Sequence, residues 1–230
     1  TIDSKLQSHV EDVFVEKKGA VICMLPKSGE IVAYLSAPDY DLNSFAGPVP
    51  IDLWEVWNSD KEKPLLNRGI QGLYPPGSIF KLIAVALARE KNIVSIDWTV
   101  ECNGVYQFGD RGFHCWNTTG HGTVNLDKAI YQSCNIYFYQ LMQKLSFRDW
   151  KEFAEKFGFG KKVLNFFEEE KKGVVPNTKW KLKNIGKGWV LGETLLAGIG
   201  QGYFQATPIQ LCLMTAQLAN GGCKIKPRII

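Results

Sequence analysis

Apolar residues recur at helical spacing at the start of the chain, at Ile2, Leu6, Val10, Val13 and Phe14. An apolar residue every three or four positions predicts an amphipathic helix over residues 2–15. Two apolar runs follow, at 19–25 and 30–36, and the link between them is Pro26-Lys27-Ser28-Gly29. Proline and glycine in so short a link predict a β-hairpin, so we expect these runs to form two central strands of a sheet.

Helical patterns dominate the middle of the chain. An apolar run after Pro75-Pro76-Gly77 predicts a helix over 79–91 that begins at or just after Gly77, because proline disfavours helical backbone in the residue before it. Residues 124–132, 133–145 and 147–157 repeat the same spacing. Later, Thr207-Pro208-Ile209-Gln210 combines a capping threonine, a first-turn proline and a glutamine, which predicts a helix start.

Three segments show no sustained period. Residues 38–77 are rich in proline, residues 99–122 are rich in aromatic residues, glycine and cysteine, and residues 161–190 carry eight lysines in a polar stretch. We expect the lysine-rich segment to be a solvated loop rather than a recognition patch. Strands at one end and helices clustered in the middle predict an α+β fold.

Composition narrows the class of protein. A length of 230 residues with 45% hydrophobic content is enough for a buried core in one large domain. The net charge of +4 is small and spread along the chain, which argues against a nucleic acid or another polyanion as partner. No apolar run approaches the roughly 18 residues of a membrane helix, and no signal peptide is recognisable.

Candidate chemistry is concentrated at Ser78-Ile79-Phe80-Lys81. Ser78 is expected in the first turn of the helix, where unpaired backbone N–H groups stabilise developing negative charge. Lys81 lies on the same face, so its amine can reach the Ser78 hydroxyl. A lysine can take the proton of a serine only if burial or another cation lowers its pKa. The pattern predicts an activated serine, although a helix-start serine followed by a solvated lysine has the same letters.

A second motif favours the catalytic interpretation. Ser133-Cys134-Asn135 is the only Ser-x-Asn in the chain, and Ser78-x-x-Lys81 is the only Ser-x-x-Lys. The two motifs occur together in penicillin-binding proteins and class A β-lactamases, where a Lys-Ser/Thr-Gly motif completes the set. Lys27-Ser28-Gly29 fits this third motif by letter, but it lies in the predicted hairpin turn and too early in the chain.

Longer stretches carry a resemblance to one family. These are Leu66-Asn67-Arg68-Gly69-Ile70-Gln71-Gly72-Leu73-Tyr74-Pro75-Pro76-Gly77-Ser78, Ser133-Cys134-Asn135-Ile136-Tyr137-Phe138-Tyr139-Gln140 and Gly198-Ile199-Gly200-Gln201-Gly202-Tyr203-Phe204-Gln205-Ala206-Thr207-Pro208-Ile209-Gln210. They resemble the penicillin-binding protein 2 family, the class B transpeptidases of cell elongation, more than the septal branch. The similarity covers nearly the whole chain, including Thr1-Ile2-Asp3 and Pro38-Asp39-Tyr40-Asp41.

The resemblance implies the fold of penicillin-binding proteins and serine β-lactamases, an antiparallel sheet flanked by helices plus an all-helical region. Residues 1–230 would be a transpeptidase domain truncated before its late sheet strands, with the Lys-Ser/Thr-Gly strand beyond Ile230. A membrane anchor and a stalk domain would precede residue 1 in the parent protein. The parent would then be a single-pass protein of the bacterial inner membrane, with this domain in the periplasm.

The resemblance also implies a reaction. Ser78 would attack the carbonyl of a D-Ala-D-Ala stem peptide of peptidoglycan, with Lys81 as base, Ser133 relaying a proton to the leaving D-alanine and Asn135 binding the substrate amide. An acceptor amine would resolve the acyl-enzyme into a cross-link, without a catalytic cofactor. β-Lactam antibiotics would acylate Ser78, and an elongation-complex glycosyltransferase would be a partner. A serine β-lactamase or a β-lactam sensor domain is the alternative.

Four further residues suggest a metal site. Cys102, Cys115, His121 and Cys134 follow one another with intervals of 12, 5 and 12 residues. Three thiolates and an imidazole form a closed tetrahedral zinc set, which would be structural. The family resemblance adds support, since many of its members carry zinc ligands at these places. The alternative is a Cys102–Cys115 disulfide, which an oxidising periplasm would permit. Of the other cysteines, Cys23 and Cys212 are expected to be packing residues, and Cys223 shows no partner.

Overall fold

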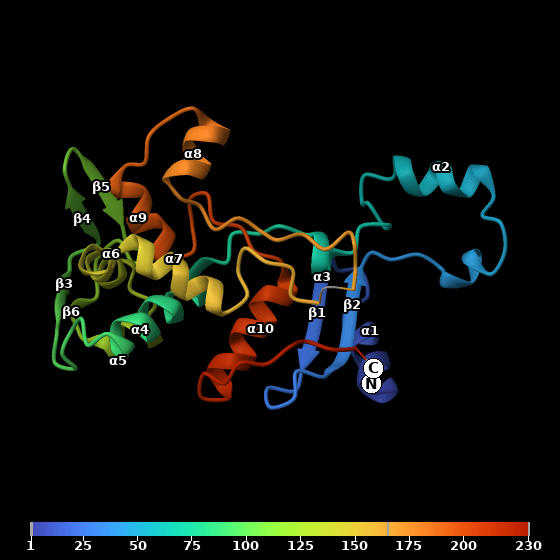
Figure 1. Ribbon diagram of the computed structural model, residues 1–230, viewed down its shortest axis with the longest axis horizontal. Helices are drawn as coiled ribbons and strands as arrows, with labels where there is room; N and C mark the ends of the chain where they lie inside the picture. Colours follow the sequence, from blue (N-terminus) through green and yellow to red (C-terminus); the bar gives the residue numbers. More distant parts are fainter. Residues whose placement is uncertain (1, 165, 230) are drawn as a thin grey trace. The chain divides into compact units, whose positions relative to one another are not determined.

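The structure is a computed structural model that describes residues 2–164 and 166–229 (Figure 1). The chain folds into two compact units. The first consists of Thr1–Tyr74, Phe157–Gly173 and Ala206–Ile230, and the second of Pro75–Lys156 and Val174–Gln205. Each unit is therefore assembled from segments that are far apart in the sequence.

The first unit contains a two-stranded antiparallel sheet with helices on both faces. Its elements are α1 (Ser4–Val13), β1 (Gly19–Met24), β2 (Ile31–Ala37), the 3-10 helix η1 (Leu42–Phe45), α2 (Ile51–Ser59), α3 (Arg68–Gln71) and α10 (Pro208–Ala219). The predicted first helix, hairpin and last helix are confirmed, and Lys27-Ser28 lies in the turn between the strands. At α10, the Gln210 side chain accepts from the Thr207 backbone N–H at 3.0 Å, as the capping pattern predicted.

The hairpin buries side chains on both faces, and its ladder has one irregularity. Residues 19–23 pair regularly with 33–37, and the register shifts between Cys23 and Met24. Ala33 packs with α1, whereas Ile31 packs with the buried residues of α3 and α10. A bulge changes the strand direction and re-aims the side chains beyond it. The bulge thus explains why Ile31 and Ala33, only two positions apart on β2, pack in different apolar clusters.

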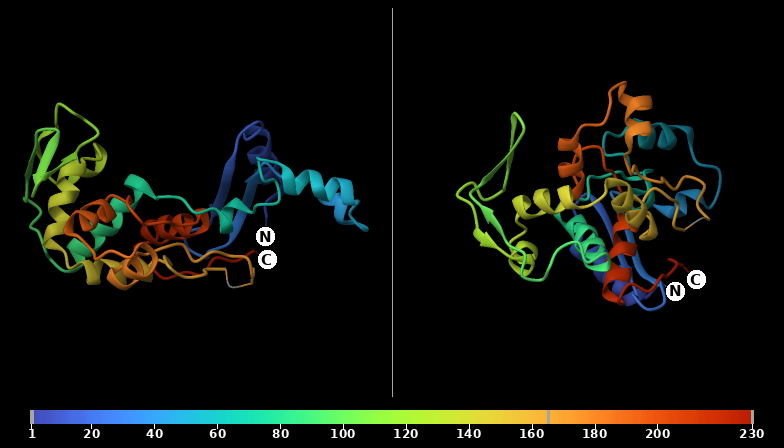
Figure 2. Two further views of the ribbon diagram at one scale, coloured as in Figure 1. Left: turned by 90° about the horizontal axis from the view of Figure 1, so that it is seen from above. Right: turned by 60° about the vertical axis from the view of Figure 1, so that its left-hand side comes forward.

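The second unit is mostly helical. Its elements are η2 (Gly77–Phe80), α4 (Lys81–Glu90), β3 (Val100–Cys102), β4 (Val105–Phe108), β5 (Arg111–His114), β6 (Gly122–Val124), α5 (Leu126–Tyr131), α6 (Asn135–Lys144), α7 (Phe147–Lys156), α8 (Thr178–Ile185) and α9 (Leu191–Gly198). Helix α6 lies at its centre and contacts α4, α5, α9 and three of the short strands (Figures 1 and 2). Its residues Ile136–Tyr139 are all buried, so α6 forms the core of this unit.

Several elements differ from the sequence-based expectation. The segment 99–122, in which the sequence showed no sustained period, contains most of two antiparallel strand pairs, β3 with β6 and β4 with β5, and the last of these strands ends just beyond it. Each strand has only three or four residues, too few for alternation to be visible. The expected solvated loop over 161–190 was wrong in part, since it contains α8 and the buried Lys181.

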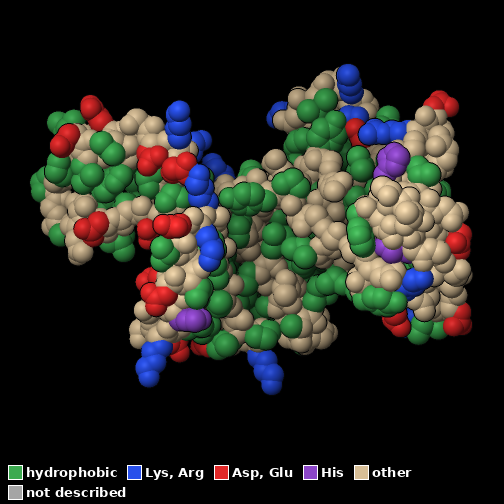
Figure 3. All heavy atoms as spheres, turned by 180° about the vertical axis from the view of Figure 1, so that it is seen from behind, with side chains coloured by type: hydrophobic (Ala, Val, Ile, Leu, Met, Phe, Trp, Pro, Cys, Tyr) green, Lys and Arg blue, Asp and Glu red, His purple; other side chains and the backbone are tan. Residues whose placement is uncertain are grey.

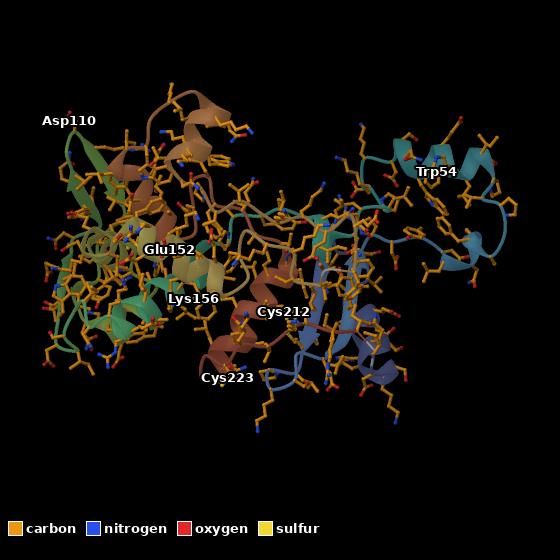
Figure 4. The ribbon with its side chains drawn as sticks, in the orientation of Figure 1. Trp54, Asp110, Glu152, Lys156, Cys212 and Cys223 are labelled. Carbon is orange, nitrogen blue, oxygen red and sulfur yellow. The ribbon has the colours of Figure 1, made fainter. Side chains whose placement is uncertain are left out.

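The segment 38–77 was expected to be irregular, and η1, α2 and α3 interrupt it. Helix α2 has apolar residues on several sides, with Ile51, Trp54 and Val56 all exposed. Figure 4 labels Trp54 on this helix, and Figure 3 shows hydrophobic side chains at the surface of the segment that carries it. Tyr40, Phe45 and Trp57 form an aromatic cluster within the segment, with ring centroids 5.3–5.6 Å apart.

Two of the remaining cysteines behave as expected. Cys212 lies on α10, donates to the Ile22 carbonyl at 3.5 Å, and has its pKa raised to about 11 by burial, which fits a packing residue (Figure 4). Cys223 is an exposed free thiol beyond the end of α10. Among the described residues, no helix has the length and apolar character needed to cross a membrane.

Candidate active site

Ser78 is exposed on a tight turn rather than in the first turn of an α-helix. It belongs to η2, whose helical turn begins at Gly77 as predicted, and α4 begins only at Lys81, two residues after the start of the helix predicted over 79–91. Gly77 before it has a positive φ of 64°, a conformation that glycine adopts without strain. The Gly77 N–H donates to the Gly200 carbonyl at 3.0 Å. The backbone before Ser78 is thus tied to a turn that follows α9.

Gly200 must be glycine for this contact to form. Its φ is 68°, and a Cβ built on it would lie 2.3 Å from the Gly77 carbonyl oxygen. The three nearest atoms all belong to the Gly77 backbone, so no flexible side chain could move away to make room. The sequence resemblance includes Gly200 in a matched segment without predicting this role; the alternating glycines at 198, 200 and 202 were the available signal.

Phe80 anchors the other side of the Ser78 turn. Its fully buried ring lies with its centroid 4.3 Å from that of Phe204 and 5.4 Å from that of Trp150. Aromatic rings at these separations contribute both burial and favourable edge contacts. The turn that presents Ser78 is therefore fixed by backbone hydrogen bonding at Gly77 and by packing at Phe80.

Lys81 points into the unit and is only 3% exposed. Its Nζ donates to the Asn135 Oδ1 at 2.7 Å, to the Ser133 carbonyl at 2.8 Å and to the Ser133 Oγ at 2.9 Å. The amine also lies 5.3 Å from the centre of the Phe138 ring. The structure thus joins the two sequence motifs through one lysine, and excludes the alternative of a solvated lysine.

Ser133 and Asn135 owe their positions to a break between two helices. The Ser133 φ is 51°, a left-handed conformation that ends α5 and redirects the chain into α6. Asn135 is the first residue of α6, and its Nδ2 donates to the His114 carbonyl at 3.3 Å. That bond orients the Asn135 amide so that its Oδ1 faces Lys81.

Burial lowers the pKa of Lys81 from 10.5 to about 8, and the Cys115 and Cys134 sulfurs oppose this only in part. A buried ammonium loses hydration that three hydrogen bonds replace incompletely. A neutral amine is therefore accessible near neutral pH, which is what a general base requires. Within the described residues no hydrogen bond joins Lys81 to Ser78, so their direct contact stays a prediction.

The four candidate zinc ligands meet in space. Their ligand atoms all lie within 4.8 Å of one another, and the three cysteines are buried. His121 Nδ1 is 3.4 Å from the Cys102 sulfur and 3.6 Å from the Cys115 sulfur. A tetrahedral zinc with ordinary bond lengths places sulfur and nitrogen about 3.5 Å apart. All six cysteines are free thiols, so the alternative Cys102–Cys115 disulfide is not formed.

The surroundings of Cys115 and His121 favour the ionisation states that bind metals, a thiolate and a neutral imidazole. Burial opposes ionisation of the Cys115 thiol, but backbone N–H groups of Asn117, Asn135 and Ile136 lower its pKa below the usual value. Burial also lowers the pKa of His121, and the nearby Lys128 and Lys81 charges add to this. A thiolate and a neutral imidazole are the forms that coordinate zinc. The cysteine–histidine cluster and the Lys81 contacts meet at the start of α6, since Cys134 lies between Ser133 and Asn135.

Comparison with known proteins shows the family of this chain. A family profile described as "Penicillin binding protein transpeptidase domain" matches residues 19–230. Peptidoglycan D,D-transpeptidase MrdA of Acinetobacter baumannii is 35% identical over 234 residues, which cover all of this chain and 34% of that protein. MrdA of Escherichia coli K12 is 32% identical over 232 residues, again covering the whole chain and 37% of the relative.

Solved structures of penicillin-binding proteins also resemble this chain. The chain superposes on Pseudomonas aeruginosa PBP2, solved in complex with WCK 5153, with a TM-score of 0.92 and 40% identity, covering 98% of this chain and 52% of that one. For Helicobacter pylori PBP2, solved in complex with MreC, the TM-score is 0.91 and the identity 36%, covering 96% and 42% of the two chains.

The fold and the paired serine motifs define a penicillin-binding transpeptidase domain, and this chain belongs to that family. Within the family it is similar to the MrdA and PBP2 proteins. The chain spans 34–37% of the length of the two MrdA proteins above.

Proposed function

We propose that this chain provides the first two catalytic motifs of a peptidoglycan D,D-transpeptidase that cross-links stem peptides through an acyl-enzyme on Ser78. The observation that carries the proposal is the buried Lys81 amine, bonded to both Ser133 and Asn135 and with its pKa lowered to about 8. The MrdA relatives bear the name of this activity, and their similarity extends over all of this chain.

The first step follows from the hydrogen-bond capacity of a neutral amine, which has two N–H groups and one lone pair. The Ser133 carbonyl and the Asn135 Oδ1 can only accept, so they take the two N–H groups. The lone pair is left for a hydroxyl proton, from Ser78 directly or through Ser133. As the Ser78 oxygen bonds to the substrate carbonyl, its proton passes to Lys81, and the Ser78 backbone N–H stabilises the oxyanion.

Collapse of the tetrahedral intermediate breaks the bond to the terminal D-alanine. The leaving amine needs a proton, which Lys81 supplies through the Ser133 hydroxyl at 2.9 Å. Asn135 orients the substrate amide. An acceptor amine then attacks the ester and gives up a proton along the same route, and Ser78 is restored as a hydroxyl. β-Lactams would stop at the acyl-enzyme, because the amine released by ring opening stays attached to the acyl group.

We further propose that Cys102, Cys115, His121 and Cys134 hold a structural zinc ion. The four ligands fill a tetrahedral set, so the ion would serve architecture and not activate water. It would tie the strands β3 and β5 to the start of α6, the helix that carries Asn135. The reaction itself needs no cofactor.

The location and partners are proposed from the relatives. The enzyme would be anchored in the bacterial inner membrane with this domain in the periplasm, where stem peptides and β-lactams are accessible. An elongation-complex glycosyltransferase would supply the glycan strands. The Helicobacter pylori relative was solved with MreC, so a protein of that kind is a second expected partner.

The test is a product assay with the full-length protein and a synthetic donor peptide ending in D-Ala-D-Ala. We expect release of one D-alanine per cross-link when an acceptor amine is present. A chromogenic cephalosporin should be opened once per active site and then retained. Continuous hydrolysis of the cephalosporin would instead identify a β-lactamase and contradict the proposal.

A further inference from the structure

Lys181 is unusual among the lysines of residues 161–190 because it is only 4% exposed. It lies on α8, and its Nζ forms an ion pair with the Glu193 Oε1 at 2.5 Å and donates to the Gly188 carbonyl at 2.6 Å. The amine also lies 5.9 Å from the centre of the Tyr203 ring. A buried ion pair is costly to form, since both charges leave water. Such a pair requires an explanation in a segment whose other lysines are exposed or only partly buried.

The carboxylate of Glu193 has a second partner. Its Oε2 accepts from the Val190 backbone N–H at 2.9 Å, which caps the first turn of α9. One side chain thus fixes the start of α9 with one oxygen and α8 with the other. We call the Lys181–Glu193 pair the clamp.

Both ends of the turn over residues 199–203 are attached to the clamp. Helix α9, which carries Glu193, ends at Gly198 directly before the turn. At the other end, Tyr203 lies beneath Lys181, and its ring centroid is 5.6 Å from that of the neighbouring Trp180. The turn contains Gly200, whose carbonyl accepts the Gly77 N–H beside Ser78.

We infer that the Lys181–Glu193 clamp is a positioning element for Ser78, acting through the Gly200 turn on the Gly77 backbone. Ser78 lies on a short, exposed 3-10 turn, so its backbone depends on neighbours rather than on a long helix. A displacement of about 1 Å at a reacting group can cost a hundredfold in rate. The effect of the clamp on acylation of Ser78 rests on the proposed transpeptidase function. Its effect on the hydrogen bond between Gly77 and Gly200 does not.

The Gly77 amide gives a direct readout of the clamp. Pro75 and Pro76 have no N–H, so Gly77 is the first amide after Tyr74 and its bond to Gly200 is its protection from exchange. In the full-length Lys181→Met variant we expect faster hydrogen exchange at the Gly77 amide. We also expect the acylation rate constant, measured with saturating fluorescent penicillin, to fall by about tenfold to a hundredfold. Lys183→Met removes an exposed lysine of the same helix and should change neither quantity.

Lys181→Arg keeps a cation that can pair with Glu193 and should retain more of the protection and of the rate than Lys181→Met does. If Lys181→Met fails to fold, Lys181→Met/Glu193→Gln leaves no unpaired charge and takes its place. Unchanged exchange at Gly77 would overturn the inference, as would a uniform rise across residues 75–156, which would make the pair merely stabilising. Failure of the wild-type protein to acylate would refute the proposed function alone, because the exchange measurement is independent of activity.

Discussion

The Lys81 amine and the Ser133 hydroxyl lie 2.9 Å apart although 52 positions separate the two residues in the chain. Both belong to helix boundaries, Lys81 at the start of α4 and Ser133 in the break between α5 and α6. The lysine is buried, and the serine reaches it from a strained backbone conformation. In the proposed mechanism, this pair is the route by which a proton moves between the nucleophile and the leaving group.

The rate of acylation should depend on the ionisation of Lys81. Because burial lowers its pKa to about 8, the neutral amine increases as pH rises through that value. We expect the acylation rate of the full-length protein to rise with pH up to about 8 and to level off above it. A rate measured from pH 6 to 10 with a fluorescent penicillin checks this. Lys81→Met should lower the rate by roughly 10²–10⁴-fold and abolish the step near pH 8.

Asn135→Asp should move that profile to higher pH. The new carboxylate would lie 2.7 Å from the Lys81 amine, where a negative charge favours the ammonium and raises its pKa. The variant should therefore be slow at pH 7 and recover part of its rate above pH 9. Asn135→Ala, which adds no charge, should lower the rate without this recovery. Identical profiles for the two variants would show that the amide does not govern ionisation of Lys81.

Gly200→Ala should damage the site without touching a catalytic side chain. The added Cβ would meet the Gly77 backbone at 2.3 Å and strain a positive φ. We expect acylation to slow by at least about tenfold, because the turn that presents Ser78 must move. Gly47→Ala is the matched control, since nothing lies within 4 Å of its added Cβ. A normal rate in Gly200→Ala would show that the Gly77 contact is dispensable.

Zinc content is directly measurable. Elemental analysis should find about one zinc per chain, because the four ligands form one closed set. Chelation should lower the melting temperature and slow acylation, since α6 loses a restraint next to Ser133, whereas reductant alone should do neither. Cys102→Ser should show the same losses, and Cys223→Ser, at an exposed thiol, should not. A metal-free, active protein with Cys102 and Cys115 oxidised together would contradict the zinc proposal.

Local signals predicted most of the fold. The hairpin, the amphipathic first helix and the capped α10 all depend on residues close in sequence, and their positions are confirmed. Helix α8 was missed because its only buried charged residue, Lys181, is stabilised by Glu193 on another helix. Burial of a lysine depends on a partner that no local pattern reveals.

In the candidate site too, local motifs were predicted from the sequence, whereas contacts between distant segments were not. The two motifs identified Lys81, Ser133 and Asn135, and the structure brings these three side chains together. The Ser78 turn depends on Gly77 meeting Gly200, a backbone contact between segments more than a hundred positions apart. The only trace of such a backbone contact in the sequence is a glycine. Glycine also occurs in turns, helix ends and bulges, so its presence alone does not predict the contact.

The most direct test of the central claim is the mass of the acyl-enzyme. Full-length protein incubated with benzylpenicillin should gain the mass of one intact antibiotic, and the modified peptide should contain Ser78. Ser78→Ala should gain nothing, while Ser133→Ala should still be labelled, more slowly. An adduct on Ser78→Ala, or on a peptide without Ser78 in the wild-type protein, would contradict Ser78 as the nucleophile.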